Sequence, residues 1–316
     1  MVKQVLSCDW GTSFLRVRLI DTADKAILAE AIDGKGIAVV YNDWLQSGLP
    51  ENKRALFYTN ILVRQIKGLS TSRLSGLPII ISGMASASIG MMELPYTAIP
   101  FKINGGQLNV EKIAADEKFE HDVLLISGLK TNKDVMRGEE TMIVGCDIKT
   151  SSTKQLFIFP GTHSKQVIVQ NGSVIDLKTY MTGELFDLLH NKSILAASVE
   201  PDNISSIGND QFTKGIEEAK DSNFLNNIFH VRAKHLFGEL GKKENHHYLS
   251  GLLIGEELKD IDKEDYENIT VVSTGSLLAR YTEALIALNL KHKLRQQNAV
   301  EALIKGQILI FNQQQQ

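Results

Sequence analysis

Residues 4–20 read Gln-Val-Leu-Ser-Cys-Asp-Trp-Gly-Thr-Ser-Phe-Leu-Arg-Val-Arg-Leu-Ile, and the prediction of the fold begins from this segment. A short apolar run ends at Asp9, and residues 10–13 have the composition of a tight turn. From residue 14 to residue 20 apolar and charged side chains alternate, which is the period of a half-buried strand. Together with a turn and a third apolar run at 26–32, the pattern predicts three strands with a Gly-Thr turn after the first.

The same order of strand, Gly-Thr turn, strand, turn and strand returns near the middle of the chain. The three strands are predicted at 155–159, 165–170 and 173–180, and Asn171-Gly172 is a strong hairpin turn. Two such units, one domain length apart, suggest a duplicated domain, although hairpins are common and shape alone leaves coincidence open. The polar stretch at 149–154 gives predicted domains of 1–149 and 150–312, followed by a disordered tail at 313–316.

Strands followed by helices fill out both halves. Apolar, partly β-branched runs predict strands at 78–82, 123–126 and 269–273. The last is followed by a helix at 276–288, in which apolar residues recur at three-to-four spacing. This mixture predicts an α/β fold.

Composition excludes several classes of protein. The 316 residues carry a formal net charge of -3, so no global positive field attracts nucleic acid or an anionic membrane. Cys8 and Cys146 are the only cysteines, too few for a secreted disulfide scaffold. Neither a signal segment nor an apolar run long enough to span a bilayer is evident, so we expect a cytoplasmic protein. The phosphate-binding loop of P-loop kinases and the commonest hydrolase motifs are missing.

Two turns carry the residue types that bind a nucleotide's phosphates. In the first, Asp9 can hold a hydrated Mg²⁺ ion, which prefers oxygen ligands, while the backbone and hydroxyls of Gly11, Thr12 and Ser13 can face phosphate oxygens. In the second, Gly161 permits close approach, Thr162 and His163 offer donors, and Lys165 offers a positive charge. The structural alternatives are an aspartate that closes a turn and a polar hairpin loop.

A third turn, Thr274-Gly275-Ser276, lies between a predicted strand and a helix. Such a turn can receive a nucleotide because a helix N-terminus offers backbone donors. The commoner alternative is an ordinary capped helix.

Residues 136–141, Met-Arg-Gly-Glu-Glu-Thr, combine a cation with two acids. Arg137 can bind a substrate carboxylate through two parallel hydrogen bonds. Glu139 or Glu140 can orient a hydroxyl group or accept its proton, and Asp9 is the rival base. The alternative is that both acids stabilise the first turn of a helix reaching residue 145.

Two smaller motifs complete the candidates. The hydroxyl-rich loop at 82–90 can contact a polyol, with Ser82 and Met84 as candidate substrate contacts, or can be a close-packed turn. Thr182 and Glu184 can contact substrate or cap a helix. His246 and its neighbour at 247 are predicted to lie in an exposed loop.

Taken in order, five motifs resemble the 2-dehydro-3-deoxygalactonokinase family. They are Asp-Trp-Gly-Thr-Ser at 9–13, Met-Arg-Gly-Glu-Glu-Thr at 136–141, Pro-Gly-Thr-His-Ser-Lys at 160–165, Met-Thr-Gly-Glu-Leu at 181–185 and Ser-Gly-Leu-Leu-Ile-Gly at 250–255. The resemblance implies the actin-like ATPase or sugar-kinase fold, in which two ribonuclease-H-like domains flank an active-site cleft. It also implies transfer of the γ-phosphate of ATP to the 6-hydroxyl of 2-dehydro-3-deoxy-D-galactonate, in galactonate breakdown.

By this resemblance, residues 9–13 and 161–165 are the two phosphate motifs and 274–277 is the adenosine motif. The expected ligands are ATP, Mg²⁺ and a sugar acid, with no nucleic acid or membrane partner, and a homodimer is left open. A kinase for another 2-keto-3-deoxy sugar acid and a non-catalytic ATP-binding protein of the same fold are the two alternatives.

Overall fold

The computed structural model describes residues 2–69, 74–202, 209–220, 223–261 and 265–315. The chain forms two compact units. Unit 1 comprises Met1–Lys149, Gly172–Val174 and Val300–Gln316, and unit 2 comprises Thr150–Asn171 and Ile175–Ala299.

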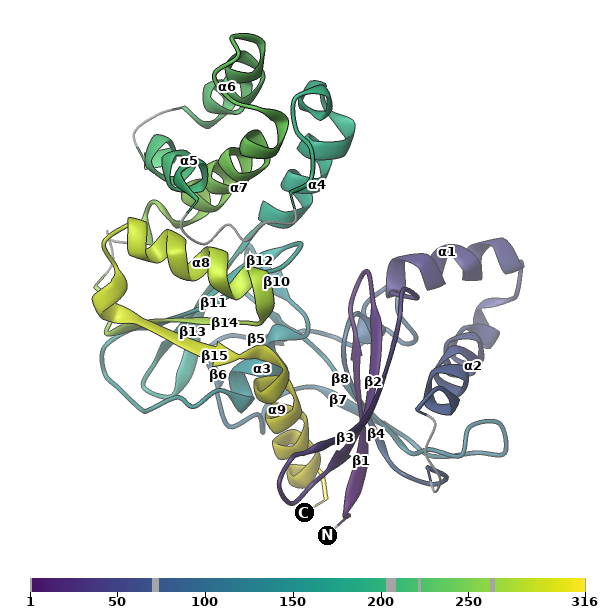
Figure 1. Cartoon of the computed structure of the whole chain (residues 1–316). Coiled ribbons are helices and arrows are strands. Elements are labelled where there is room, and N and C mark those ends of the chain that lie inside the picture. The colour runs from purple at the N-terminus through teal and green to yellow at the C-terminus, as the bar shows by residue number, and fades with distance from the viewer. Residues whose placement is uncertain (1, 70–73, 203–208, 221–222, 262–264, 316) are drawn as a thin grey trace. The chain divides into compact units, whose positions relative to one another are not determined.

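Unit 1 is built on a mixed six-stranded sheet with the order β3-β2-β1-β4-β8-β7 (Figure 1). The first three strands are antiparallel neighbours, β1, β4 and β8 run parallel, and β7 is antiparallel to β8. The bounds are β1 Gln4–Trp10, β2 Leu15–Asp21, β3 Ile27–Asp33, β4 Ile79–Gly83, β7 Val110–Ile113 and β8 Val123–Ile126.

Two helices, α1 Ile37–Ser47 and α2 Arg54–Lys67, pack on one face of this sheet. Their apolar residues recur at helical spacing, and Trp44 and Tyr58 enter the same core as the strand residues Trp10, Val17 and Ile81. Burial of these large side chains is the main source of stability for the unit.

The remaining regular elements of unit 1 are short, apart from the last helix. A three-stranded sheet has the order β10-β9-β5. The bounds are β5 Thr97–Ala98, β6 Phe101–Lys102, β9 Leu129–Lys130, β10 Val135–Met136, α3 Glu139–Gly145 and α9 Ala299–Gln313.

Helix α9 returns to unit 1 and packs closely on α3 through glycines. A Cβ atom at Gly306 would lie 1.8 Å from the carbonyl oxygen of Thr141, and one at Gly145 would lie 1.8 Å from that of Ala302. No real Cβ tolerates such distances, so the two helix backbones can meet only because these positions are glycine.

Unit 2 repeats the strand order of unit 1. Its strands follow the order β15-β14-β11-β12-β13, in which β11 is antiparallel to β12 and parallel to β14, as β1 is to β2 and β4. The predicted duplication is therefore present in the topology. The bounds are β11 Gln155–Phe159, β12 Ser164–Gln170, β13 Ser173–Tyr180, β14 Asn268–Ser273 and β15 Leu294–Asn298.

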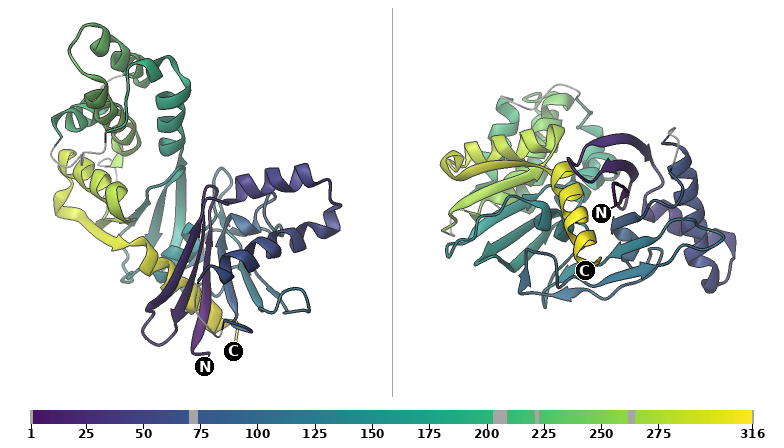
Figure 2. Two further views of the ribbon diagram at one scale, coloured as in Figure 1. Left: turned by 45° about the vertical axis from the view of Figure 1, so that its right-hand side comes forward. Right: turned by 90° about the horizontal axis from the view of Figure 1, so that it is seen from below.

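Figure 2 shows the helices of unit 2 in teal, green and yellow-green. Among the residues described, five of them are α-helices. One apolar cluster joins the sheet to α5, α7 and α8, and a second lies among α4, α6 and α7. The bounds are α4 Thr182–Lys192, α5 Asp210–Lys220, α6 Phe224–Leu236, α7 Lys242–Leu258 and α8 Gly275–Ala287.

The predicted strands and the helix after β14 are confirmed, with bounds within two residues of those observed. The prediction for His246 and His247 is wrong, because both are buried in α7. The compact units also differ from the sequence-based division at 149/150, since residues 300–316 join unit 1. Gln313, the first residue of the predicted tail, is the last residue of α9. Among the helices in the described part of the chain, none is long and apolar enough to cross a membrane.

Candidate active site

The first Gly-Thr turn joins β1 to β2 and is held by the start of α1. The amide of Gly11 donates to the carbonyl of Phe14, closing the turn at 3.0 Å. The carbonyl oxygens of Gly11 and Thr12 accept hydrogen bonds from the amides of Ile37 and Ala38 at 3.0 and 3.2 Å. The first amides of α1, which have no partner within the helix, thus hold the turn in place. The outer side of the turn's backbone is left available for a ligand.

Gly36, just before α1, permits this close approach. A Cβ atom there would lie 2.3 Å from the carbonyl oxygen of Thr12 and 2.3 Å from the carbonyl carbon of Ser13. The indole Nε1 of Trp10 donates to the neighbouring carbonyl of Lys35 at 2.9 Å and fixes the same contact from the strand side. The turn is therefore rigidly placed against the helix.

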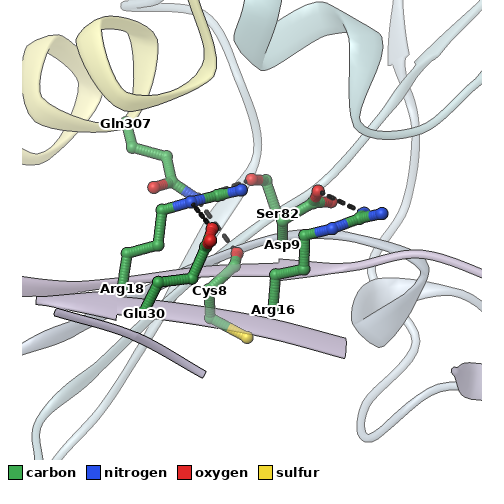
Figure 3. Close-up of polar contacts among 7 residues, drawn as sticks. All are labelled: Cys8, Asp9, Arg16, Arg18, Glu30, Ser82 and Gln307. Carbon is green, nitrogen blue, oxygen red and sulfur yellow. Dashed lines mark hydrogen bonds and ion pairs between the residues drawn. The ribbon is translucent and has the colours of Figure 1, made fainter. Parts of the chain in front are cut away.

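Asp9 presents a partly exposed carboxylate beside the turn (Figure 3). Arg16, its cross-strand neighbour, lies 3.4 Å from Oδ2, and 31% of the Asp9 side chain is exposed. Burial raises the pKa of Asp9, while the positive charges of Arg16 and Arg18 oppose that rise. A carboxylate in this position is able to bind a hydrated cation from the open side.

Behind Asp9, α9 is joined to the sheet by Gln307 (Figure 3). Its Nε2 donates to the Ser82 hydroxyl at 2.7 Å, to the Cys8 carbonyl at 3.0 Å and to the Ile80 carbonyl at 3.3 Å. Ser82 is almost fully buried. Met84 is half-buried and packs against the apolar core.

Glycines also bring the start of α3 to the ends of β1 and β4. Gly83 and Gly138 have φ values of 95° and 114°, which favour glycine. A Cβ at Gly83 would lie 2.7 Å from the Trp10 carbonyl oxygen, and one at Gly138 would lie 3.4 Å from the Cα of Gly83. The motif at 136–141 is therefore beside the first turn.

The two acids of that motif have different environments. Glu139 is half-buried, and its Oε2 accepts a hydrogen bond from the Arg137 amide at 3.2 Å. Glu140 is fully buried, and its two oxygens accept from the Gly138 amide at 2.7 Å and the Thr141 hydroxyl at 3.0 Å. Burial, and secondly the charge of Glu139, raise the pKa of Glu140 to about 8. In this conformation both carboxylate oxygens of Glu140 are bonded to its neighbours at the start of α3.

Arg137 lies inside the loop that follows β4. Its Nη1 donates to the Ser86 hydroxyl at 2.5 Å and its Nη2 to the Leu94 carbonyl at 3.2 Å, while the guanidinium carbon lies 4.1 Å from the ring centre of Tyr96. Its Nε is buried without a hydrogen-bond partner. The side chain therefore orders residues 82–94.

The second Gly-Thr turn, between β11 and β12, is held by the start of α4. The Glu184 amide donates to the Thr162 carbonyl at 3.0 Å, and the Glu184 carboxylate lies 2.5 Å from Nε2 of His163. Gly183 permits the contact, since a Cβ there would lie 2.5 Å from the carbonyl oxygen of Gly161. Helix α4 thus braces this turn as α1 braces the first.

Two neighbouring side chains have polar partners of their own. The Nζ of Lys165 donates to the His163 carbonyl at 2.8 Å, and the side chain is largely buried. The Thr182 hydroxyl donates to the carboxylate of Glu257. The five candidate substrate contacts belong to two different units. Ser82, Met84 and Arg137 are in unit 1, and Thr182 and Glu184 are in unit 2.

The third candidate turn follows β14. Thr274 is extended and precedes α8 without a side-chain capping bond. Gly275 has a φ of 59°, and nothing lies within 4 Å of where its Cβ would be. The exposed Ser276 follows, so this helix start is open to a ligand.

Within the described residues, no group of three or more histidine, cysteine, aspartate or glutamate side chains could hold a metal ion. A site made only of protein ligands is therefore not seen there. A single carboxylate suits Mg²⁺, which usually keeps several of its waters and binds through one or two carboxylates and substrate phosphates.

The sequence model of the 2-keto-3-deoxy-galactonokinase family matches residues 9–308. This match covers both Gly-Thr turns, the motif at 136–141 and the turn at 274–276. The chain belongs to the 2-keto-3-deoxy-galactonokinase family.

Individual relatives agree with this family. The 2-dehydro-3-deoxygalactonokinase of Escherichia coli strain K12 is 35% identical over 222 residues, which are 67% of this chain and 71% of that one. A crystal structure described as that of a candidate 2-dehydro-3-deoxygalactonokinase from Sinorhizobium meliloti is 28% identical and superimposes with a TM-score of 0.82, covering 98% of this chain and 96% of that one. The motif-based resemblance is confirmed.

A more distant structure supports the fold. The activator of 2-hydroxyisocaproyl-CoA dehydratase from Clostridium difficile, solved with bound ADPNP, superimposes with a TM-score of 0.51 at 10% identity, covering 98% of this chain and 94% of that one. The predicted actin-like ATPase fold is confirmed, and this 2-keto-3-deoxy-galactonokinase family member has that fold.

Three residues that support the candidate site of this family member were not found from the sequence. Gly36 and Gln307 hold the first turn and the strand ends beside it, and Glu257 lies behind the second turn. Each acts through partners distant in sequence, and none belongs to a local motif of known chemistry. The only sequence signal was that Glu257 closely follows the motif at 250–255.

Proposed function

We propose that this chain is a kinase that transfers the γ-phosphoryl group of ATP to the 6-hydroxyl of 2-dehydro-3-deoxygalactonate. The observation that carries the proposal is the family match over residues 9–308, which includes every turn with phosphate-binding chemistry. In the reaction, the sugar hydroxyl oxygen bonds to the γ-phosphorus, the bond from that phosphorus to the β–γ bridging oxygen breaks, and the hydroxyl proton passes to a base. Products are the 6-phosphate and ADP.

Phosphoryl transfer depends on alignment and charge stabilisation more than on covalent chemistry. In unit 1 we assign the first turn, with Gly11, Thr12 and Ser13, to phosphate oxygens. Asp9 would hold a hydrated Mg²⁺ ion, which would neutralise charge developing on the phosphates. The partial exposure of the Asp9 carboxylate supports this assignment.

Three acids are candidates to orient the hydroxyl or accept its proton. Glu140 is the least suited in this conformation, because it is fully buried and both its oxygens accept hydrogen bonds. Asp9 and Glu139 retain partial exposure. We therefore assign the proton to Asp9 or Glu139.

In unit 2 we assign Gly161, Thr162 and His163 to phosphate oxygens, with Lys165 adding positive charge. The open helix start at Thr274, Gly275 and Ser276 would receive the adenosine part. Lys165 would release its hydrogen bond with the His163 carbonyl to reach a phosphate.

The sugar acid would be contacted by the remaining candidates, Ser82, Met84, Arg137, Thr182 and Glu184. Arg137 already donates hydrogen bonds to Ser86 and Leu94, so these contacts would have to rearrange before its guanidinium could bind a substrate carboxylate. Its Nε is buried without a hydrogen-bond partner. Glu184 is accessible, with 38% of its side chain exposed.

The test is an assay that couples ADP release to a spectroscopic signal, run with Mg-ATP and a panel of 2-keto-3-deoxy sugar acids. We expect ADP release to require the sugar acid and to be fastest with the galactonate derivative. Asp9→Asn should lower kcat by about a hundredfold or more while the fold survives, by analogy with losses at positioned charged groups. Asp24→Asn, in an exposed turn of the same unit, is the matched control.

Three other outcomes would each lead to a different conclusion about this protein. Faster turnover of another sugar acid would reassign the substrate within the same class of kinases. Binding of ATP without sugar-dependent ADP release would indicate a non-catalytic member of the fold. Near-wild-type kcat in Asp9→Asn would remove Asp9 from the chemistry.

A further inference from the structure

Glu257 is a buried acid on α7 that receives hydrogen bonds from three hydroxyl groups. Oε1 accepts from Ser164 at 2.7 Å, and Oε2 accepts from Thr182 at 2.5 Å and from Tyr281 at 2.6 Å. The Gln166 amide donates to the backbone carbonyl of Glu257 at 3.2 Å. Only 4% of the residue is exposed. A buried carboxyl with this many partners is a connected polar network inside unit 2.

The network suits a carboxylate, whose oxygens are acceptors only. Three hydroxyls donate to its two oxygens, which together offer about four acceptor sites. Burial raises the pKa of Glu257, and the hydroxyl donors oppose that rise. Burial and the neighbouring charge of Glu257 also raise the pKa of Tyr281, so the phenol remains a donor.

The three donors come from three elements that carry or brace the proposed nucleotide contacts. Ser164 is the first residue of β12, directly after the second Gly-Thr turn. Thr182 is the first residue of α4, and the next two residues, Gly183 and Glu184, contact that turn. Tyr281 lies on α8, which begins at Gly275 in the proposed adenosine turn. One carboxylate therefore joins the phosphate turn, its bracing helix and the adenosine helix.

We propose that Glu257 is a positioning residue for the nucleotide: its carboxylate fixes the phosphate turn and the adenosine helix of unit 2 at the spacing that ATP requires. The proposal rests on the proposed kinase function for its ligand. Glu257 does not itself contact ATP, because its carboxylate oxygens are occupied by side chains of the unit. Hydrogen bonds to a buried charge are stronger than neutral ones, so they can hold three elements in one arrangement.

The test compares Glu257→Gln with Glu256→Gln, its neighbour on α7, which pairs with Lys259 near the surface. Glutamine keeps the size but replaces one acceptor oxygen with a donor. We expect the KM for ATP, and the Kd for a non-hydrolysable ATP analogue measured by calorimetry, to rise about tenfold, the effect of losing one hydrogen bond to a charged group. Thr182, one of the three donors, is also a proposed sugar contact, so the deciding measurement is the affinity for the nucleotide and not the KM for the sugar acid. Glu256→Gln should change neither constant.

Removing single donors tests the network without touching the acid. Ser164→Ala and Tyr281→Phe should each weaken binding of the ATP analogue. Adding Ser164→Ala to Glu257→Gln should cost less than the product of the two single effects, because both remove the same hydrogen bond. These two hydroxyl variants keep the test decisive if Glu257→Gln does not fold.

The outcomes separate this inference from the proposed function. If wild-type protein binds the analogue but produces no sugar-dependent ADP, the kinase proposal fails while the binding comparison still tests Glu257. If the variants lose thermal stability but keep wild-type affinity for the analogue, Glu257 has only a structural role and the inference is overturned.

Discussion

Replacement of Glu140 by glutamine is predicted to make unit 1 more stable, and more so as the pH rises. Glu140 is fully buried at the start of α3, and burial raises its pKa from 4.5 to about 8. Because the pKa is higher in the folded protein than in the unfolded chain, unfolding releases a proton between these values. The free energy of unfolding therefore falls as the pH rises from about 4.5 to 8, and Glu140 causes no further change above pH 8.

The size of this effect follows from the shift. Each pH unit in that window changes the unfolding free energy by about 1.4 kcal/mol, so Glu140 accounts for about 5 kcal/mol at most. Glutamine has no proton to lose, and its oxygen can still accept from the Gly138 amide. We expect the variant to resemble wild type near pH 5 and to exceed it by about 2 to 5 kcal/mol at pH 8.

Tryptophan fluorescence during urea unfolding measures this effect selectively. The two tryptophans, Trp10 and Trp44, both lie in the core of unit 1. Glu139→Gln is the control: it removes the smaller of the two causes that raise the pKa of Glu140, so its pH dependence should be only slightly weaker than that of wild type. Parallel pH curves for wild type and Glu140→Gln would refute the assignment of a neutral, buried Glu140.

Three further substitutions test the contacts around the two turns. Gly36→Ala should destabilise unit 1 by about 2 kcal/mol through overpacking and raise the KM for ATP, whereas Gly34→Ala, with nothing within 4 Å, should do neither; equal effects would refute the bracing role. Gln307→Leu should lower the urea midpoint by the equivalent of about 1 to 3 kcal/mol, since it removes the hydrogen bonds that the buried amide donates to Ser82 and to two strand carbonyls, and an unchanged midpoint would contradict this. Gly183→Ala should weaken ATP binding in calorimetry, because its Cβ would lie 2.5 Å from the carbonyl oxygen of Gly161; unchanged affinity would speak against that contact.

Much of the fold could be predicted because its signals are local. Alternation in β2 and the Asn171-Gly172 turn each depend on a few adjacent residues, and the repeated strand order then follows from their succession. The burial of Arg18 could not be predicted from alternation, which places it on the polar face of β2. It is buried in the fold and pairs with Glu30 at 2.6 Å.

The supporting contacts of the candidate site were hidden because they join distant parts of the chain. Ser164 and Glu257 are 93 residues apart, and Gln307 lies 299 residues beyond Cys8. In the sequence, Gln307 cannot be distinguished from a polar surface residue of an amphipathic helix. Only the structure shows that it contacts β1 and β4. The motifs therefore predicted the turns, whereas the residues that hold those turns required the structure.

The return of α9 to unit 1 has a consequence for biosynthesis. A nascent chain released as far as residue 299 has every strand of the unit 1 sheet but lacks the helix whose glutamine ties β1 to β4. Unit 1 is therefore complete only after residues 300–313 have been synthesised. Splitting the gene at residue 149 would yield an N-terminal fragment that needs residues 300–313 supplied in trans.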